Sequence, residues 1–303
     1  MRVLVTGAAG FLGRRLVERL AAIGHDVTAI GRCPIPAQFI SSKNAVWIER
    51  DIGRDGLDPD EIDGIDTVFH LAGATLGAGQ DEWRFLLANE ATTVRLLQAC
   101  AKHAKKLIFA SSHAIYGDVN HSAVTEDFPK QGVGSAYACS KLNSENWLRW
   151  FQKKYGGLYI ALRFTGFVEG GGAIDYIIDR ALRNEPIELF SKGAVRRDYF
   201  PVENGIEAFL GALRYEGTEG FVPFNIGSGQ AISSFEWAKL ICAEVGSSSK
   251  IILLPAPAPQ GDFVFDIRKA TQCMGFKPGE ISTSVLAYAH RKKAVFESNV
   301  RDA

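Results

Sequence analysis

The stretch VLVTGAAGFLGRRLVERL, residues 3–20, decides the fold of this chain. It begins with an apolar run, continues through glycines at every third position, and ends in a segment whose leucines recur at every fourth position. This order predicts a buried strand, a tight turn and an amphipathic helix. One glycine would permit the turn, one would let the backbone approach a bound group, and one would let the helix pack on the strand.

The glycine turn has the spacing of a phosphate site. The glycines are Gly7, Gly10 and Gly13, in the order Gly-x-x-Gly-x-x-Gly, and Phe11 and Leu12 open the helix. Phosphate groups bind at helix N-termini because free N–H groups and the helix dipole both favour an anion. We therefore expect these five residues to hold the pyrophosphate of a dinucleotide. A plain strand-to-helix turn is the alternative.

Short apolar runs alternate with helical segments beyond this stretch. Runs such as VLV and LIFA are apolar on both faces, as expected of strands that helices cover on both sides. The pattern predicts an α/β fold with a Rossmann-like, doubly wound parallel sheet. We expect residues 1–165 to form a dinucleotide-binding domain, with later strands from about 194–226. Residues 166–193 and 227–303 are expected to form a smaller, interleaved C-terminal substrate lobe.

Composition and charge exclude several classes of protein. The chain has 303 residues, of which 47% are hydrophobic, and its 34 Lys and Arg balance its 34 Asp and Glu. Because neither sign of charge is in excess, we expect neither a nucleic-acid nor a membrane partner. The five cysteines are odd in number and scattered, which argues against a disulfide framework or a metal site. No stretch resembles a signal peptide or a membrane span, so we expect a cytoplasmic protein.

The end of the second predicted strand bears on the choice of cofactor. There the chain reads VTAIGRC, with Gly31 followed by Arg32 and no carboxylate. An acidic residue at this point usually binds the 2′-hydroxyl of NAD, whereas arginine can pair with the 2′-phosphate of NADP. We therefore expect NADP to be favoured over NAD. The alternative is that Arg32 is a solvated loop cation.

A tyrosine and a lysine stand four positions apart in SAYACSKLNSE, residues 135–145. Residues at this separation share a face of any helix. Taken alone, Tyr137 and Lys141 therefore indicate a solvated helix surface more than a catalytic pair, and other motifs have to decide between the two interpretations.

The order and spacing of the motifs resemble the extended short-chain dehydrogenase/reductase family, which contains NAD(P)-dependent nucleotide-sugar epimerases, dehydratases and ketoreductases. The resemblance runs from Val3 to about Pro278 and rests on TGAAGFLG, HLAG, SSHAIYG and YACSK. It implies that the tyrosine and lysine are a catalytic pair. It also implies cofactor contacts from residues at the carboxyl edge of the sheet: Asp51 and Ile52 at the adenine, Leu71, Ala72 and Gly73 after the fourth strand, Asn89 in the next helix, and Tyr137 and Lys141.

The resemblance further implies the chemistry of the site. Tyr137 would exchange a proton with a substrate hydroxyl, although an unperturbed tyrosine, with a pKa of about 10, is a weak base. Lys141 would supply a positive charge that favours the phenolate, and would hydrogen-bond the cofactor ribose. Ser112 would bind and polarise the substrate oxygen, since it precedes Tyr116 by four residues as the family's catalytic residue does. Ser111 is the alternative.

Later motifs resemble those of nucleotide-sugar enzymes. RRDYFPVENGIEAFLGAL, residues 196–213, resembles the family segment whose arginine, here Arg197, contacts the substrate pyrophosphate. His113 and Ala114 stand where the family's dehydratases have an Asp-Glu pair, which argues against 4,6-dehydration. His113 is either an acid–base group or a hydrogen-bonding residue of the substrate pocket. Gly166 stands where many relatives have an asparagine that touches the substrate phosphate.

Two enzymatic activities fit these residues. A nucleotide-sugar epimerase would oxidise C4 of the sugar and return the hydride with a cofactor that never leaves, whereas an NADPH-dependent 4-keto-sugar-nucleotide reductase would release its cofactor after each turnover. We favour the epimerase. A non-catalytic cofactor-sensing protein fits less well, because such proteins commonly lose the tyrosine or the lysine. Relatives often dimerise through two helices that correspond to 82–103 and 136–154, so a homodimer is expected.

Overall fold

The centre of the molecule is a seven-stranded sheet in the order β12-β7-β5-β4-β1-β2-β3. The computed structural model describes residues 1–35, 44–75, 81–100, 103, 105–117, 119–258 and 261–301. All neighbouring strands of this sheet are parallel. The strands are β1 (Arg2–Thr6), β2 (Asp26–Gly31), β3 (Ala45–Glu49), β4 (Thr67–His70), β5 (Lys106–Ser112), β7 (Leu158–Phe164) and β12 (Gly220–Ile226).

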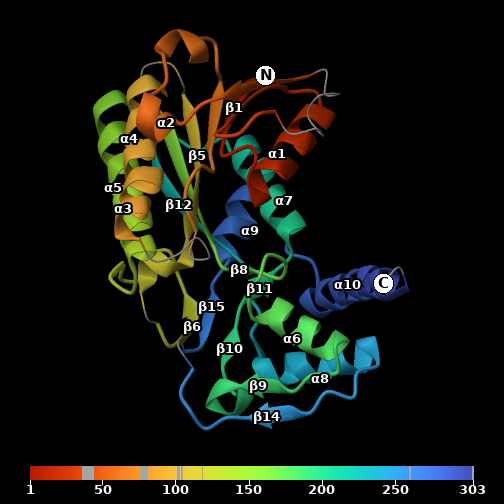
Figure 1. Cartoon of the computed structure of the whole chain (residues 1–303). Coiled ribbons are helices and arrows are strands. Elements are labelled where there is room, and N and C mark those ends of the chain that lie inside the picture. Colours follow the sequence, from red (N-terminus) through yellow and green to blue (C-terminus); the bar gives the residue numbers. More distant parts are fainter. Residues whose placement is uncertain are drawn as a thin grey trace.

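Helices cover both faces of the sheet (Figure 1). One face is covered by α1 (Phe11–Ala22), α7 (Val202–Arg214) and α9 (Arg268–Met274). The other face is covered by α2 (Ile52–Asp55), α4 (Thr92–Cys100) and α5 (Ala136–Tyr155). Every residue of the inner strands β4 and β7 is buried, because helices pack on them from above and below. The predicted α/β, doubly wound parallel sheet is confirmed.

The predicted helix 82–103 is built of three parts in the described residues. It comprises α3 (Glu82–Phe85), a π-helical turn (Leu86–Ala91) and α4, which ends at Cys100. Residues 101 and 102 of this prediction lie outside the described residues. A π turn widens the helix by one residue, and such turns often lie at functional sites.

A smaller lobe lies beyond the carboxyl ends of the strands (Figure 1). Its apolar core joins α6 (Ala173–Leu182), α8 (Ser234–Val245) and α10 (Ile281–Arg301) with the parallel pair β9 (Ile187–Leu189) and β14 (Ile251–Leu253). Short strands connect it to the large sheet: a four-stranded sheet of β13 (Ile232–Ser233), β10 (Arg196–Arg197), β15 (Phe263–Phe265) and β6 (His121–Val124), and the pair β11 (Tyr199–Phe200) and β8 (Gly166–Phe167). Three 3₁₀ turns, Pro59–Ile62, His113–Tyr116 and Phe190–Gly193, complete the elements described.

The C-terminal third of the chain contributes to both lobes. Helix α9 lies within residues 227–303, and its Ala270 and Met274 belong to the core that α1 and α7 form with the large sheet. The boundaries of the two lobes drawn from the sequence remain predictions. In the part of the chain that the structure describes, no helix is both long and apolar enough to cross a membrane.

Candidate active site

The strand order reverses between β1 and β4, and the glycine turn lies at this point. Gly7 has φ of +68°, and a Cβ there would lie 2.6 Å from the backbone nitrogen of Ala72. A Cβ on Gly13 would lie 2.1 Å from the Gly7 carbonyl oxygen. A side chain at position 7 or 13 would therefore collide with the backbone where the turn, the loop after β4 and the start of α1 meet. Crevices at such reversals are where doubly wound sheets bind nucleotides.

The N-terminus of α1 fits a phosphate group. Its N-cap is Gly10, which has no side chain with which to cap the helix, and its first turn carries no acidic residue. The first N–H groups of a helix have no partner within the helix. Phe11 and Leu12 begin this helix and are partly buried. The turn and the helix thus fit the pyrophosphate of a dinucleotide, and the contacts that their residues would make with it remain predictions.

A buried chain of hydrogen bonds holds the adjoining loop. His70, at the end of β4, is 2.9 Å from Thr6 Oγ1 through Nδ1 and 2.9 Å from Thr93 Oγ1 through Nε2. Thr93 donates to the Asn89 carbonyl at 2.6 Å, so its oxygen accepts from His70 Nε2–H and the Thr6 hydroxyl donates to Nδ1. Burial, aided by the charge of Lys141, lowers the pKa of His70 to about 3. His70 is thus a neutral link between two strands and α4, which the sequence did not indicate.

Asn89 fixes the loop after β4. Its Oδ1 accepts from the Ala74 N–H at 2.7 Å, and its amide donates to the Ala74 carbonyl at 3.3 Å and to Ser140 Oγ at 2.7 Å. A Cβ on Gly73 would lie 2.8 Å from that Oδ1. Asn89 therefore holds the loop Leu71–Gly73 against the catalytic helix. The expected cofactor contacts of these residues remain predictions.

The residues expected at the adenosine end lie after β2 and β3. Arg32 is exposed, directly after β2. The Asp51 carboxylate caps α2 by accepting from the Arg54 N–H at 3.2 Å. The Ile52 side chain belongs to the core on the α2, α4 and α5 face of the sheet. A contact of Ile52 with adenine would thus involve its backbone.

The three expected catalytic residues meet at the carboxyl end of β5. Ser112 ends that strand and its hydroxyl accepts from the Ala114 N–H at 3.2 Å. Tyr137 lies in the first turn of α5, and Lys141 follows one turn later on the same face. Lys141 Nζ donates to the Ala110 carbonyl at 2.8 Å and lies 6.0 Å from the centre of the Tyr137 ring. The pair seen in the sequence therefore lies against the carboxyl end of β5 and is not a solvated surface, while its catalytic role remains a prediction.

Burial shifts both members of the pair toward their neutral forms. It raises the pKa of Tyr137, and the Ser112 side chain acts in the opposite direction. It lowers the pKa of Lys141 to about 8, against the opposing charge of Glu145. Lys141 is still mostly an ammonium at neutral pH. A positive charge beside the phenol favours its ionised form, which is what a proton acceptor at this position requires.

The geometry distinguishes Ser112 from its alternative. The Ser111 hydroxyl is buried and donates to Glu145 Oε1 at 2.7 Å, on the part of α5 beyond Lys141. Ser112, one residue later, is the serine that acts on the pKa of Tyr137. The structure therefore places Ser112, and not Ser111, beside the tyrosine.

His113 and Arg197 face each other across the two lobes. His113 Nδ1 lies 3.2 Å from the Phe164 carbonyl and therefore carries the proton, while Nε2 lies 3.5 Å from Arg197 Nη2. Burial and the guanidinium charge lower the pKa of His113 to about 4. Arg197 is itself anchored to the Gly261 carbonyl at 2.8 Å. A neutral, doubly hydrogen-bonded His113 fits a residue of the substrate pocket better than an acid–base group.

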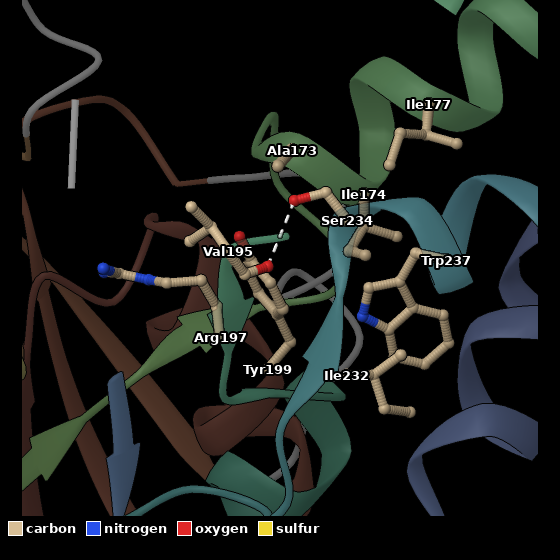
Figure 2. Close-up of a pocket in the computed structure, with 9 residues that line it drawn as sticks. All are labelled: Ala173, Ile174, Ile177, Val195, Arg197, Tyr199, Ile232, Ser234 and Trp237. Carbon is tan, nitrogen blue, oxygen red and sulfur yellow. Dashed lines mark hydrogen bonds between the residues drawn. The ribbon is translucent and has the colours of Figure 1, made fainter. Parts of the chain in front are cut away.

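A cavity of about 410 Å³ opens in the smaller lobe beside Arg197. Tyr176, Leu189 and Phe190 line it, so aromatic and aliphatic surfaces adjoin one cationic side chain. A smaller neighbouring pocket, drawn in Figure 2, has Arg197 and Tyr199 on one side and the apolar surface of α6 and α8 on the other. Sequence motifs did not indicate this cavity, because its lining comes from separate loops and helices. Among the described residues, no cluster of His, Cys, Asp or Glu could hold a metal ion.

Three features are together typical of a dinucleotide-dependent enzyme on a doubly wound sheet. They are the glycine turn, the uncapped N-terminus of α1, and the arrangement of Ser112, Tyr137 and Lys141. The chain belongs to the NAD dependent epimerase/dehydratase family, whose sequence model matches residues 3–227. This confirms the family resemblance seen in the sequence.

Individual relatives match nearly the whole chain. A putative UDP-glucose 4-epimerase from Methanocaldococcus jannaschii is 28% identical over 290 residues, which are 91% of this chain and 93% of the relative. UDP-glucuronic acid decarboxylase 1 from Danio rerio is 26% identical over 91% of this chain and 69% of its own length. The structure of UDP-glucuronic acid 4-epimerase from Bacillus cereus in complex with NAD has a TM-score of 0.82 at 26% identity, covering 97% of this chain and 100% of that one.

The preference for NADP that Arg32 suggested is wrong. The matching family is NAD dependent, and the Bacillus cereus structure contains NAD. The physical reason is that Arg32 is exposed and carries only donors, which can bind the neutral hydroxyls of a ribose as well as a phosphate. A cation at this strand end therefore does not exclude NAD.

Proposed function

We propose that this protein is an NAD-dependent UDP-sugar 4-epimerase that acts by transient oxidation at C4 of the sugar. One observation carries the proposal: Ser112, Tyr137 and Lys141 lie together, with Lys141 beside Gly73 in the loop that contacts the glycine turn, and with Ser112 next to His113, which faces Arg197 at the cavity. The kinship with 4-epimerases over more than nine-tenths of the chain supports it.

The residues of the chain divide the chemistry among them. Ser112 donates a hydrogen bond to the oxygen on C4, and Tyr137 takes the proton of that hydroxyl and later returns it. The ammonium of Lys141 stabilises the phenolate during this exchange. Bound NAD supplies the hydride acceptor and donor. The loop Leu71–Gly73, held by Asn89, would fix the distance between the cofactor and the reacting carbon.

The cavity in the smaller lobe is assigned to the nucleotide. Arg197 would pair with the diphosphate, for which a guanidinium offers two parallel donors. Phe190 and Tyr176 offer aromatic surface to a base. His113 Nε2, which carries no proton, would accept a hydrogen bond from a sugar hydroxyl from the opposite lobe.

Other activities make different demands. The NADPH-dependent reductase is not favoured, because the family is NAD dependent and the relatives described above are epimerases or a decarboxylase. A uronic-acid decarboxylase would begin with the same oxidation at C4 and then lose carbon dioxide. Both activities would start with oxidation at C4, so the identity of the sugar decides which product forms.

The test is incubation of the purified protein with UDP-glucose and, separately, with UDP-glucuronic acid, followed by chromatography and mass spectrometry of the products. A product of unchanged mass that is epimeric at C4 is the expected result, whereas loss of carbon dioxide would indicate the decarboxylase. Tyr137→Phe should reduce turnover by about 10²-fold or more while NAD and UDP still bind. Tyr155→Phe, at the exposed end of the same helix, is the matched control. Equal activity of both variants would refute the role of Tyr137.

We also propose that the protein is a homodimer. The helical layer formed by α3, the π turn and α5 exposes large apolar side chains, namely Trp83, Leu86, Leu87, Trp147 and Trp150. Exposure of several large apolar side chains on elements that pack against each other is typical of an interface between subunits. Light scattering coupled to gel filtration would give the mass, and substitution of Trp83 and Trp150 by glutamate should yield a monomer.

A further inference from the structure

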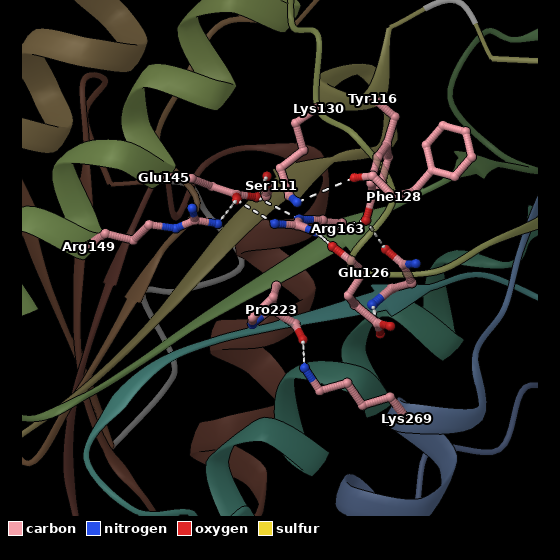
Figure 3. Close-up of polar contacts among 11 residues, drawn as sticks. Ser111, Tyr116, Glu126, Phe128, Lys130, Glu145, Arg149, Arg163, Pro223 and Lys269 are labelled. Atoms are coloured by element: carbon pink, nitrogen blue, oxygen red, sulfur yellow. Dashed lines mark hydrogen bonds and ion pairs between the residues drawn. The ribbon is translucent and has the colours of Figure 1, made fainter.

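A charged pair is completely buried behind the catalytic residues. The guanidinium of Arg163 on β7 donates through Nε and Nη2 to the two oxygens of Glu145 on α5, at 2.9 and 2.8 Å, and both side chains are 0% exposed (Figure 3). Desolvating two charges costs more than their attraction usually returns. An apolar pair of the same volume would hold the core at least as well, so a role beyond core stability is the better explanation.

The pair is the centre of a network that connects the two lobes. Arg163 Nη1 also donates to the Tyr116 hydroxyl at 2.7 Å and to the Glu126 carbonyl at 3.0 Å. Tyr116 in turn donates to Asn225 Oδ1 at 2.7 Å. Asn225 lies on β12, and Glu126 follows β6, the strand that joins the smaller lobe. Ser111 on β5 donates to Glu145 as described above. The network therefore spans β5, α5, β7 and β12, together with the segment after β6.

Two side-chain hydrogen bonds hold helix α5, which carries Tyr137, on strand β5, which ends at Ser112. Lys141 donates to the carbonyl of Ala110 at 2.8 Å, and Glu145, one turn further along α5, accepts from the hydroxyl of Ser111 at 2.7 Å. Consecutive residues of β5 are thus bound by side chains on consecutive turns of α5. Ser112 is the next residue of the strand.

We propose that Glu145 and Arg163 form a positioning unit that keeps Ser112 in register with Tyr137 and Lys141. This inference rests on the proposed function. Lys141 is expected to bind the cofactor ribose as well as β5. Its ammonium group would then donate to the cofactor and to the Ala110 carbonyl at the same time. The bond between Glu145 and Ser111 does not depend on the cofactor, and Arg163 holds the carboxylate in the orientation that this bond requires. The helix therefore stays fixed on the strand throughout turnover.

The same unit has an electrostatic consequence for Lys141. The titratable groups near its ammonium are Glu145 and Tyr137 on its own helix and His70 on β4, whose pKa is lowered by the Lys141 charge. Glu145 is the negative group among them, and it raises the pKa of Lys141. Loss of that charge should make Lys141 release its proton at lower pH.

The decisive variant is the double substitution Glu145→Gln with Arg163→Met, which removes both buried charges; Arg149, whose Nη2 lies 3.7 Å from Glu145 Oε2, is partly exposed and stays solvated. We expect it to fold, to lower kcat about tenfold or more with little change in KM, and to shift the alkaline limb of the pH profile downward, since Glu145 acts on Lys141 directly and the lost Arg163 charge offsets only part of that effect. Ser111→Ala should lower kcat without moving that limb. Lys106→Met, a cation at the opposite end of β5, is the control and should leave both quantities unchanged. A folded double variant with the kcat and pH profile of the wild type would overturn the proposal.

A second readout separates this inference from the proposed function. The titration of Lys141 can be followed by NMR of isotope-labelled lysine, with the signal assigned by its loss in Lys141→Met. The wild-type midpoint should lie near pH 8, and the midpoint of the double variant should be lower. This measurement needs no turnover. If no UDP-sugar reacts, the proposed function fails, while an unchanged Lys141 midpoint refutes the electrostatic part of the positioning unit by itself.

Discussion

Acidification should weaken the fold through His70, and the size of the effect follows from its burial. The folded protein holds His70 neutral, with a pKa of about 3 in place of the ordinary 6.5. Above pH 6.5 neither the folded nor the unfolded chain protonates this ring, so it has no effect there. Below that pH the unfolded chain binds a proton at His70 that the folded chain does not bind. The free energy of unfolding therefore falls as the pH falls.

The loss amounts to about 1.4 kcal/mol for each pH unit between the two pKa values. At about pH 5 this single residue should therefore cost about 2 kcal/mol relative to neutral pH, a large share of the 5 to 15 kcal/mol that typically separates folded from unfolded chains. The proton would also break the acceptor role of Nδ1 toward Thr6, which holds the strand next to the glycine turn. The folded chain takes up this proton only near pH 3, so the loss of stability precedes any change at the glycine turn.

The assay is urea unfolding, followed by tryptophan fluorescence at neutral and at acidic pH, for the wild type and for His70→Gln. Glutamine hydrogen-bonds without titrating, so the other histidines and the carboxylates cancel in the comparison. His70→Gln should be less stable than the wild type at neutral pH, because one buried hydrogen bond is lost, and this difference should shrink by about 2 kcal/mol at about pH 5. An equal loss of stability in both proteins would refute the assignment of a neutral, buried His70.

Three further predictions concern the cofactor and substrate sites. Gly7→Ala should abolish retention of NAD, measured by mass spectrometry of the denatured protein, because a Cβ would lie 2.6 Å from Ala72 at a φ of +68°; stoichiometric NAD in this variant would contradict the role of the turn. The activity of the wild type should decline above about pH 8 as Lys141 loses its proton, and Lys141→Arg should abolish this decline although its kcat is lower. Arg197→Gln should weaken binding of UDP about tenfold or more in calorimetry and leave NAD binding unchanged; an unaltered affinity for UDP would remove Arg197 from the nucleotide site.

The local motifs were sufficient to predict the fold and the family. A glycine turn between an apolar strand and an amphipathic helix has few structural solutions, since only glycine tolerates the approach of Ala72 to position 7. The alternation of apolar runs and helices required strands covered on both faces, which the completely buried β4 and β7 display. Both features depend on residues that are neighbours in the chain.

Cofactor choice shows where such reasoning fails. Arg32 follows β2 and no carboxylate stands beside it, so charge alone suggested NADP. Binding depends on which donors face which oxygen, and an exposed arginine can serve either cofactor. The comparison with NAD-dependent relatives corrected this prediction.

The sequence by itself determined the sheet, the glycine turn and the shared helix face of Tyr137 and Lys141, because spacing along a strand or a helix fixes these relations. Only the tertiary structure decided which serine faces the tyrosine, that His70 joins β1 to α4, and that Glu145 and Arg163 are buried together. The partners in these contacts lie on different strands and helices, and His70 and Thr6, for example, are 64 residues apart. Hydrogen bonds in the core are selected by the need to pair every buried polar group, and that condition exists only once the chain has folded.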